Sequence, residues 1–480
     1  MNTLDTRFDI TLDLFHRVAW GGEPIELAAG ARDRIARRRA QFIALLEQDA
    51  AHAVYGVNQG QGEMIGYQLS EAQQQRLARL KPFPAAVSFG EYYPDRVTRG
   101  VVLARFANFL HGHAAATPRL ADALIEMLNV GPMPRLAATG QGGAGEILAL
   151  YPLFADLSKK FELEYAERGA FINGAPCAAA LAADIALAAR RRLDLSLEVM
   201  AVAIEAFDAP RAHFDPALGT LWGGADHAAI FTALDALLGA PRTQQRRHQA
   251  PVSYRIIPAV LAQAHAAAVR VAEVAATALA AVTHNPTYLE PDSGHPHGRV
   301  VSTGGFHNAL AAPAMDAVAG AAADLCLLCG RLVVGLLNGR GSGYPDFLMS
   351  GRDVSESDGH GALGYLPMAI AGFVEEARSF AQRTPIPAMD ASVFGQDDVA
   401  APAFLAWPKA VKAGESLDRC LAVLAVTASQ ALHLNRREPA EPLRALTKAV
   451  RRIVPPVAED RVLWPELQRL SEAFGARVFR

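Results

Sequence analysis

Apolar residues recur with the spacing of an α-helix over most of this chain of 480 residues. Alanine is abundant in these stretches and alternating β-branched residues are rare, so strands are disfavoured. Two stretches, 258–282 and 308–338, are apolar on nearly all sides, which is typical of helices inside a bundle or between subunits. The helical period predicts a mainly α protein with helices over 30–50, 68–81, 96–116, 118–130, 145–160, 178–206, 227–239, 258–282, 308–338, 360–381 and 402–436.

Strand signals are few. The clearest is "FELEYAERGAFING" at 161–174, which predicts a surface hairpin closed by Asn-Gly. The chain contains no clear internal repeat and no low-complexity linker. We therefore predict a smaller N-terminal subdomain over 1–200 and a long helical bundle over 201–480.

The charge balance excludes several classes of partner. Lys and Arg number 46 against 49 Asp and Glu, so a net charge of -3 offers no general attraction for nucleic acid or anionic membranes. The N-terminus lacks the pattern of a signal peptide. The apolar runs are interrupted by charge and are predicted to be too short to span a membrane. These features favour a cytoplasmic protein that acts on a small molecule.

Two patterns suggest metal or redox chemistry, and both are weak. Cys326 and Cys329 have Cys-x-x-Cys spacing, but no second pair completes a zinc site, and on an apolar helix this spacing favours core packing. The histidine pairs, His111 with His113 and His295 with His297, lack the further ligands that zinc needs. The Gly-rich loop at 136–147 also lacks the Gly-Lys-Ser/Thr end of a phosphate cradle. We expect neither a metal nor a dissociable cofactor.

Polar, Gly- and Pro-rich loops separate the helices, and function is expected there. Four loop motifs occur in order: "YGVNQGQG" (55–62), "QAPVSYR" (249–255), "HNP" with "GGFH" (284–307), and "YPDFL" (344–348). Together they resemble the aromatic amino acid ammonia-lyase and aminomutase family, histidine ammonia-lyases in particular. The resemblance implies an ammonia-lyase-like fold and a homotetramer in which loops of three subunits build each active site.

The loop "TGQGGAGE" (139–146) departs from that family at its most important position. In the family, an Ala-Ser-Gly tripeptide cyclises and loses water to form the electrophile methylidene-imidazolone. The matching residues here are Gly143, Ala144 and Gly145, followed by Glu146 where the family usually has Asp. Because the methylene of the electrophile comes from the serine side chain, Ala144 has no hydroxyl to lose. We expect this chain to lack the group and with it ordinary deamination of histidine, phenylalanine or tyrosine.

The resemblance also assigns roles in the first loop. Tyr55 matches the family tyrosine that takes the β-proton of the substrate, a role that requires neighbours able to stabilise a phenolate. The alternative is a buried tyrosine with a structural hydrogen bond. Asn58 lies in the same loop, where its amide could bind substrate or fix the turn.

Other positions match substrate-binding residues. Arg255 corresponds to the arginine that clamps a substrate carboxylate, and Gln249 matches beside it. Asn285 matches a site residue, although Asn before Pro also caps turns. Phe347 would line the pocket, and Asp397 in "GQDDVA" would supply the carboxylate that faces the substrate. The alternative for Arg255 is a structural ion pair, and the alternative for Phe347 is a position in the hydrophobic core.

Three further positions depart from the family or are ambiguous. Val252 stands where a second tyrosine is common, and Pro84 or a neighbour replaces a histidine. The family asparagine of an Asn-Gly-Thr motif could be Asn173, which also fits the predicted hairpin. His307 is expected to pack near the site within its turn.

These residues favour an enzyme of the lyase family that works without the electrophile. It would need a better leaving group than ammonia, such as the trimethylammonium of an ergothioneine-type betaine. Alternatively, it would act as a dehydratase, isomerase or cyclase on an activated, carrier-bound substrate of polyketide or aryl polyene pigment pathways. A non-catalytic binding or scaffold protein with the same fold is the alternative from another class.

Overall fold

A computed structural model describes the chain except residues 49–52, 80–84, 239–248, 350–361, 387–394 and 477–480. The described residues form two compact units, each built from three separate segments. Unit 1 contains Met1–Leu187, Val271–Ala314 and Thr384–Trp407, and unit 2 contains Ala188–Arg270, Met315–Arg383 and Pro408–Arg480. The predicted boundary at residue 200 falls inside a single helix, and that division remains a prediction.

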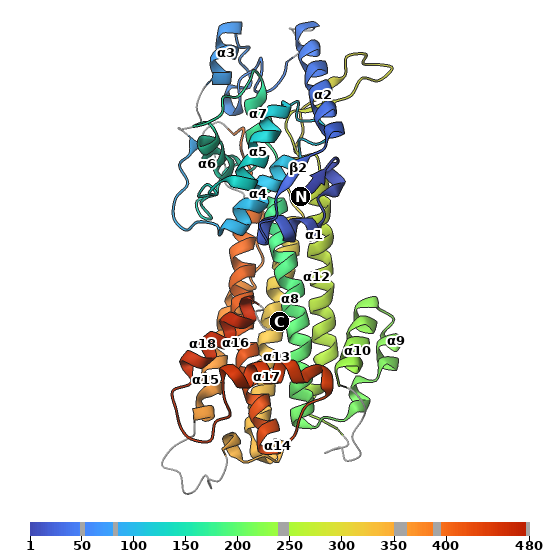
Figure 1. Ribbon diagram of the computed structural model, residues 1–480, viewed down its shortest axis with the longest axis vertical. Coiled ribbons are helices and arrows are strands. Elements are labelled where there is room, and N and C mark those ends of the chain that lie inside the picture. Colours follow the sequence, from blue (N-terminus) through green and yellow to red (C-terminus); the bar gives the residue numbers. More distant parts are fainter. Residues whose placement is uncertain (49–52, 80–84, 239–248, 350–361, 387–394, 477–480) are drawn as a thin grey trace. The chain divides into compact units, whose positions relative to one another are not determined.

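Unit 1 combines short helices with two pairs of short strands (Figure 1). Strands β1 (Asn2–Leu4) and β2 (Ile25–Leu27) pair in parallel, while β3 (Thr287–Leu289) and β4 (Arg299–Val301) pair antiparallel. Its complete helices are η1 (Arg7–Asp9), α1 (Leu12–Phe15), η2 (His16–Trp20), α2 (Ala29–Gln48), η3 (Gly62–Met64), α3 (Glu71–Arg79), α4 (Asp95–Ala107), α5 (Pro118–Val130), α6 (Ile147–Leu157) and α7 (Glu167–Ile172).

Four long helices contribute residues to both units: α8 (Pro176–Phe207), α12 (Ile257–Ala280), α13 (Ala311–Leu337) and α16 (Ala403–Leu434). The remaining helices belong to unit 2: η5 (Arg211–Phe214), α9 (Pro216–Trp222), α10 (Ala225–Leu238), α11 (Val252–Arg255), α14 (Gly339–Ser342), η6 (Asp346–Leu348), η8 (Ala362–Tyr365), α15 (Leu366–Phe380), η9 (Glu441–Leu443), α17 (Arg444–Ile453) and α18 (Trp464–Ala476).

The prediction of a mainly α protein is confirmed, and several helix ranges agree closely. The helix predicted over 118–130 is α5, where Thr117 Oγ1 accepts a hydrogen bond from the N–H of Leu120 and Pro118 occupies the first turn. The ranges predicted from apolar periodicity over 178–206 and 258–282 match α8 and α12 to within two residues at each end.

The predicted hairpin at 161–174 is wrong. Residues 167–172 form helix α7, and Asn173 and Gly174 lie in the short link between α7 and α8. Gly174 has a φ of +126°, a conformation that glycine adopts readily. The Asn-Gly pair therefore forms a turn between two helices. It indicates a turn, but it does not indicate strands on either side.

The prediction that the apolar runs are too short to cross a membrane is also wrong. In the described part of the chain, three helical stretches, including α12 and α13, have the length and the apolar composition that crossing a membrane requires. In the chain alone, only 44% of the most apolar window of α12 and 56% of that of α13 are buried. Both helices therefore leave apolar surface uncovered in a single chain.

Unit 2 has a core of helices held by ion pairs and apolar contacts. Arg192 on α8 pairs with Asp418 on α16 at 2.8 Å, and both side chains are largely buried. Cys326 and Cys329 lie buried on α13 as free thiols, close to Cys420 of α16. Their positions agree with the core-packing interpretation of this Cys-x-x-Cys pair.

Candidate active site

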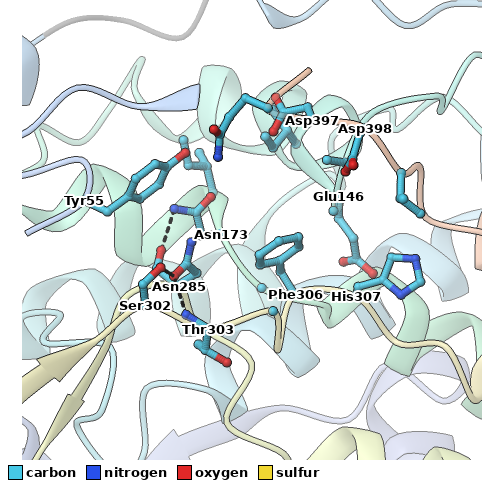
Figure 2. Close-up of a pocket in the computed structure, with 18 of the residues that line it drawn as sticks. Tyr55, Glu146, Asn173, Asn285, Ser302, Thr303, Phe306, His307, Asp397 and Asp398 are labelled. Carbon is cyan, nitrogen blue, oxygen red and sulfur yellow. Dashed lines mark hydrogen bonds between the residues drawn. The ribbon is translucent and has the colours of Figure 1, made fainter. Parts of the chain in front are cut away.

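A cavity of about 620 Å³ lies within unit 1 (Figure 2). Loops from distant parts of the sequence meet there, including the two loops that carry Tyr55 and Ala144. The described residues that line it are Tyr55, Ile65, Ala144, Gly145, Glu146, Ile147, Ile172, Asn173, Gly174, Asn285, Ser302, Thr303, Gly304, Phe306, His307, Ala309, Ile386, Gln396, Asp397, Asp398 and Val399.

Tyr55 lines the cavity with a partly buried phenol. Its oxygen accepts a hydrogen bond from the N–H of Gly62 at 2.9 Å. Burial raises the pKa of Tyr55 above its ordinary value of 10.0, the Gly62 donor opposes this shift, and the charge of Asp397 adds to it. In this chain alone the phenol is therefore neutral at pH 7, and a nearby positive charge is needed to favour the phenolate.

The loop at 143–145 approaches the cavity from a second side. Gly145 has a φ of +64°, and a Cβ atom there would lie 3.1 Å from the ring of Phe306. Position 145 therefore favours glycine for both conformation and space. The carbonyl of Gly143 accepts a hydrogen bond from Ala401 at 3.3 Å, which joins this loop to the segment that follows Asp397 and Asp398.

Two asparagines form a connected polar wall. The side-chain amide of Asn173 donates to the backbone carbonyl of Asn285 at 2.7 Å. The side-chain oxygen of Asn285 accepts from the N–H of Thr303 at 2.9 Å and from the Ser302 hydroxyl at 3.1 Å. The backbone of 302–303 and the α7–α8 link are thereby fixed relative to each other (Figure 2).

Glu146 is buried at the edge of the cavity and caps helix α8. Its carboxyl oxygens accept hydrogen bonds from the N–H groups of Cys177 and Ala178 at 2.5 and 2.6 Å. Burial raises its pKa to about 7, against the opposing effect of these donors and of the nearby Arg105 guanidinium. This carboxyl therefore titrates near neutral pH, unlike an exposed glutamate.

Arg105 on α4 lies behind the Asn173 wall with no exposed surface. Its guanidinium donates to the carbonyls of Ala170 and Asn173 at 3.1 and 2.8 Å, and lies 3.4 Å from the ring of His284. Burial lowers the pKa of Arg105 to about 10, which still leaves the guanidinium charged at pH 7. The site thus has a buried positive charge behind one of its walls.

The remaining polar lining includes two carboxylates. Asp397 and Asp398 lie beside the cavity, and the ring of His307 contacts the carbonyl of Ala400 at 3.3 Å. Among the described lining residues there is no lysine or arginine. With the ring of Phe306 exposed to the same space, this lining suits a cationic group.

The structure brings together some of the predicted site residues. Tyr55, Ala144, Asn285 and Asp397 line one cavity. Asn58 does not line it: this residue is buried, and its side-chain oxygen accepts a hydrogen bond from the N–H of Val54 at 2.7 Å. The position of Asn58 therefore agrees with the alternative in which its side-chain amide fixes the turn.

Gln249, Arg255 and Phe347 belong to unit 2 and are not among the lining residues. Gln249 and Arg255 are exposed, and Phe347 is half-buried in η6 with a φ of +58°. Pro84 lies outside the described residues. Any role of Gln249, Arg255 and Phe347 at this cavity remains a prediction.

Sequence reasoning left out several lining residues. Asn173 was ambiguous, although Asn-Gly directly before a long apolar stretch was a usable signal for a link into a helix. Ser302 and Thr303 carried no signal of their own, because their place depends on the pairing of β4 with β3. Phe306 was part of the "GGFH" motif, which did not by itself assign it to the pocket. In the described part of the chain, no group of three His, Cys, Asp or Glu side chains is arranged to hold a metal ion.

Comparison with known proteins assigns this chain to a family. The family model described as aromatic amino acid lyase matches residues 10–158 and 154–452. The histidine ammonia-lyase of Deinococcus radiodurans is 28% identical over 96% of this chain and 91% of its own length. That of Sorangium cellulosum is 27% identical over 96% of this chain and 95% of its own length.

Solved structures show the same fold. Ergothionase from Treponema denticola, in complex with desmethyl-ergothioneine sulfonic acid, superimposes with a TM-score of 0.88 at 18% identity, over 100% of this chain and 99% of its own. Tyrosine aminomutase from Streptomyces globisporus gives a TM-score of 0.87 at 22% identity, over 100% and 97% of the two chains. With the family match covering most of its length, this chain belongs to the aromatic amino acid lyase family.

Proposed function

We propose that this protein is a carbon–nitrogen lyase that eliminates a good leaving group without a methylidene-imidazolone. The observation that carries the proposal is Ala144, which lines the cavity at the position matched to the family serine. Its side chain is a single methyl group, so the residues present do not fit the formation of that group. No step of the proposed reaction uses it.

The acidic lining supports a cationic substrate. Asp397, Asp398 and the ring of Phe306 offer carboxylate and π contacts to a trimethylammonium group. Such a charge beside Tyr55 also lowers the cost of forming the phenolate, which burial and Asp397 otherwise raise. A substrate with a trimethylammonium group therefore fits this cavity better than a substrate without a cationic group does.

The proposed reaction is an elimination with Tyr55 as base. The Tyr55 phenolate takes the proton from Cβ, the electrons of that C–H bond form the Cα=Cβ double bond, and the Cα–N bond breaks. Trimethylamine leaves with the electrons of the broken bond, and the proton remains on Tyr55. For an ergothioneine-type betaine, the thione-imidazole ring stabilises the negative charge that develops at Cβ, so a weak base suffices.

The substrate carboxylate requires a partner that unit 1 does not supply among its described lining. We propose that the protein assembles as a homotetramer, in which Arg255 of a neighbouring subunit binds this carboxylate and Gln249 and Phe347 complete the pocket. The uncovered apolar surface of α12 and α13 supports such an assembly. We expect a cytoplasmic enzyme with these helices buried between subunits.

An assay with four substrates tests the proposal. The purified protein is incubated separately with histidine, phenylalanine, tyrosine and ergothioneine, while ultraviolet absorption and the released amine are measured. Trimethylamine released only from ergothioneine supports the proposal. Rapid release of ammonia from a plain amino acid, as expected of a histidine ammonia-lyase, contradicts it, and no turnover of any of the four favours a binding protein or a different substrate.

A further inference from the structure

The link between α7 and α8 carries Asn173 into the cavity, and a buried ionisable side chain holds each end of it. Arg105 binds the end of α7 through the carbonyls of Ala170 and Asn173. Glu146 binds the start of α8 through the N–H groups of Cys177 and Ala178. The link between them, residues 173–175, has no charged side chain of its own.

Each contact matches the polarity of the helix end that it serves. A guanidinium is favourable at the C-terminus of a helix, where carbonyls lack partners, and a carboxyl group is favourable at an N-terminus. Helix α8 begins at Pro176, and the preceding Ala175 has no side-chain acceptor with which to cap it. Glu146 therefore provides from another segment the cap that the local sequence lacks.

The packing around the link leaves little freedom. A Cβ atom on Gly174 would lie 3.0 Å from both Arg105 Nη2 and Thr283 Oγ1. Thr283 Oγ1 in turn accepts from the N–H of Ala175 at 3.0 Å. A shift of the arginine would therefore move the link, and with it the side chain of Asn173.

Glu146 also connects this link to the loop that carries Ala144. It follows Gly145 directly, so the carboxyl group that caps α8 is joined to the second wall of the cavity by one peptide bond. The groups that interact electrostatically with this carboxyl are Arg105 from α4, Cys177 from α8 and Tyr93, which precedes α4.

We propose that Arg105 and Glu146 are positioning residues, which together place Asn173 and the loop at 143–145 for substrate binding. The role in substrate binding rests on the proposed function, whereas the role in ordering the two segments does not. Neither side chain needs to contact the substrate. Their effect reaches it through Asn173 on one wall and through the backbone of 144–145 on the other.

Matched controls exist within unit 1. Arg39 is also buried and donates to two carbonyls, those of Ala115 and Tyr165, but it is not among the lining residues of the cavity. Glu167 is buried and accepts from the N–H groups of Thr117 and Glu164, both at 2.7 Å. The pairs Arg105→Met with Arg39→Met and Glu146→Ala with Glu167→Ala therefore remove similar contacts, at the α7–α8 link for the first variant of each pair and near the start of α7 for the second.

The experiment measures ergothioneine affinity by calorimetry in proteins that also carry Tyr55→Phe, so that the substrate is bound but not turned over. It also measures thermal stability and hydrogen exchange of peptides that cover 143–146 and 172–175. For Arg105→Met, the loss of hydrogen bonds from a charged donor predicts affinity weaker by about tenfold or more and faster exchange in both peptides. Arg105→Lys, which keeps the charge, should recover part of both. The control variants should lower thermal stability with little change in affinity or in these two peptides.

Three outcomes are informative. Faster exchange in both peptides with weaker binding in the Arg105 and Glu146 variants alone supports the proposal. Equal effects in the controls, or unchanged exchange at 172–175 in Arg105→Met, overturns it. If the wild-type protein binds no ergothioneine, the proposed substrate class fails, and the exchange comparison alone then decides whether these residues order the two segments.

Discussion

Replacement of Glu146 by glutamine should remove a pH dependence from the stability of the protein. The carboxyl pKa is raised from 4.5 to about 7 in the folded chain, chiefly because the group is buried. Between these two values the folded state binds more protons than the unfolded state, so the free energy of unfolding falls as pH rises. The difference of about 2.5 pH units, at ~1.4 kcal/mol each, corresponds to about 3.5 kcal/mol.

Glutamine imitates the protonated carboxyl, since it keeps one acceptor oxygen and carries no charge. Near pH 5, Glu146→Gln should therefore differ from the wild type by about 1 kcal/mol, the usual size of one altered hydrogen bond. Near pH 8 the variant should be the more stable of the two, by about 2–3 kcal/mol, because only the wild type bears the cost of a buried carboxylate.

The assay is urea denaturation of both proteins at intervals from about pH 5 to about pH 8. Parallel curves for Glu146→Gln and the wild type, or a wild-type stability that rises through this window relative to the variant, would refute the reasoning. Either result would mean that Glu146 is ionised at low pH in the folded chain.

Three other changes test the site, the core and the assembly. Tyr55→Phe should lower kcat for ergothioneine by about 10²–10⁴-fold with an unchanged circular dichroism spectrum, because the base is lost. Arg192→Met should cost about 3–5 kcal/mol in urea denaturation, because Asp418 stays buried without its partner. Glutamate at both Leu327 and Val334, which are 46% and 47% exposed on α13, should give a smaller species in light scattering than the proposed tetramer.

The helices were predictable because their signal is local. Apolar periodicity found α5, α8 and α12 to within two residues at their ends, since the buried face of each helix repeats along its own sequence. The misassigned hairpin at 161–174 shows the limit of local signals. An Asn-Gly pair specifies a turn, but the elements on either side depend on what they pack against, here Arg105 and Thr283.

The site was only partly predictable, because local sequence patterns do not report contacts between distant segments. Tyr55, Ala144, Asn285 and Asp397 were found through loop motifs that carry the family resemblance, and the structure brings them to one cavity. Glu146 appeared in the sequence only as a substitution for aspartate. Its burial and its contacts with Cys177 and Ala178 depend on residues about 30 positions away, a separation no local pattern reports.

The most direct test of the central claim is mass spectrometry of the tryptic peptide that spans residues 136–159, which contains Gly143, Ala144 and Gly145. The account predicts the mass of the encoded peptide, with fragment ions that pass without interruption through these three residues. A peptide lighter by the mass of one water and two hydrogens, with fragmentation blocked between 143 and 145, would show that the backbone has cyclised and that the Ala144 side chain has become a methylene, and would contradict an elimination that works without the electrophile.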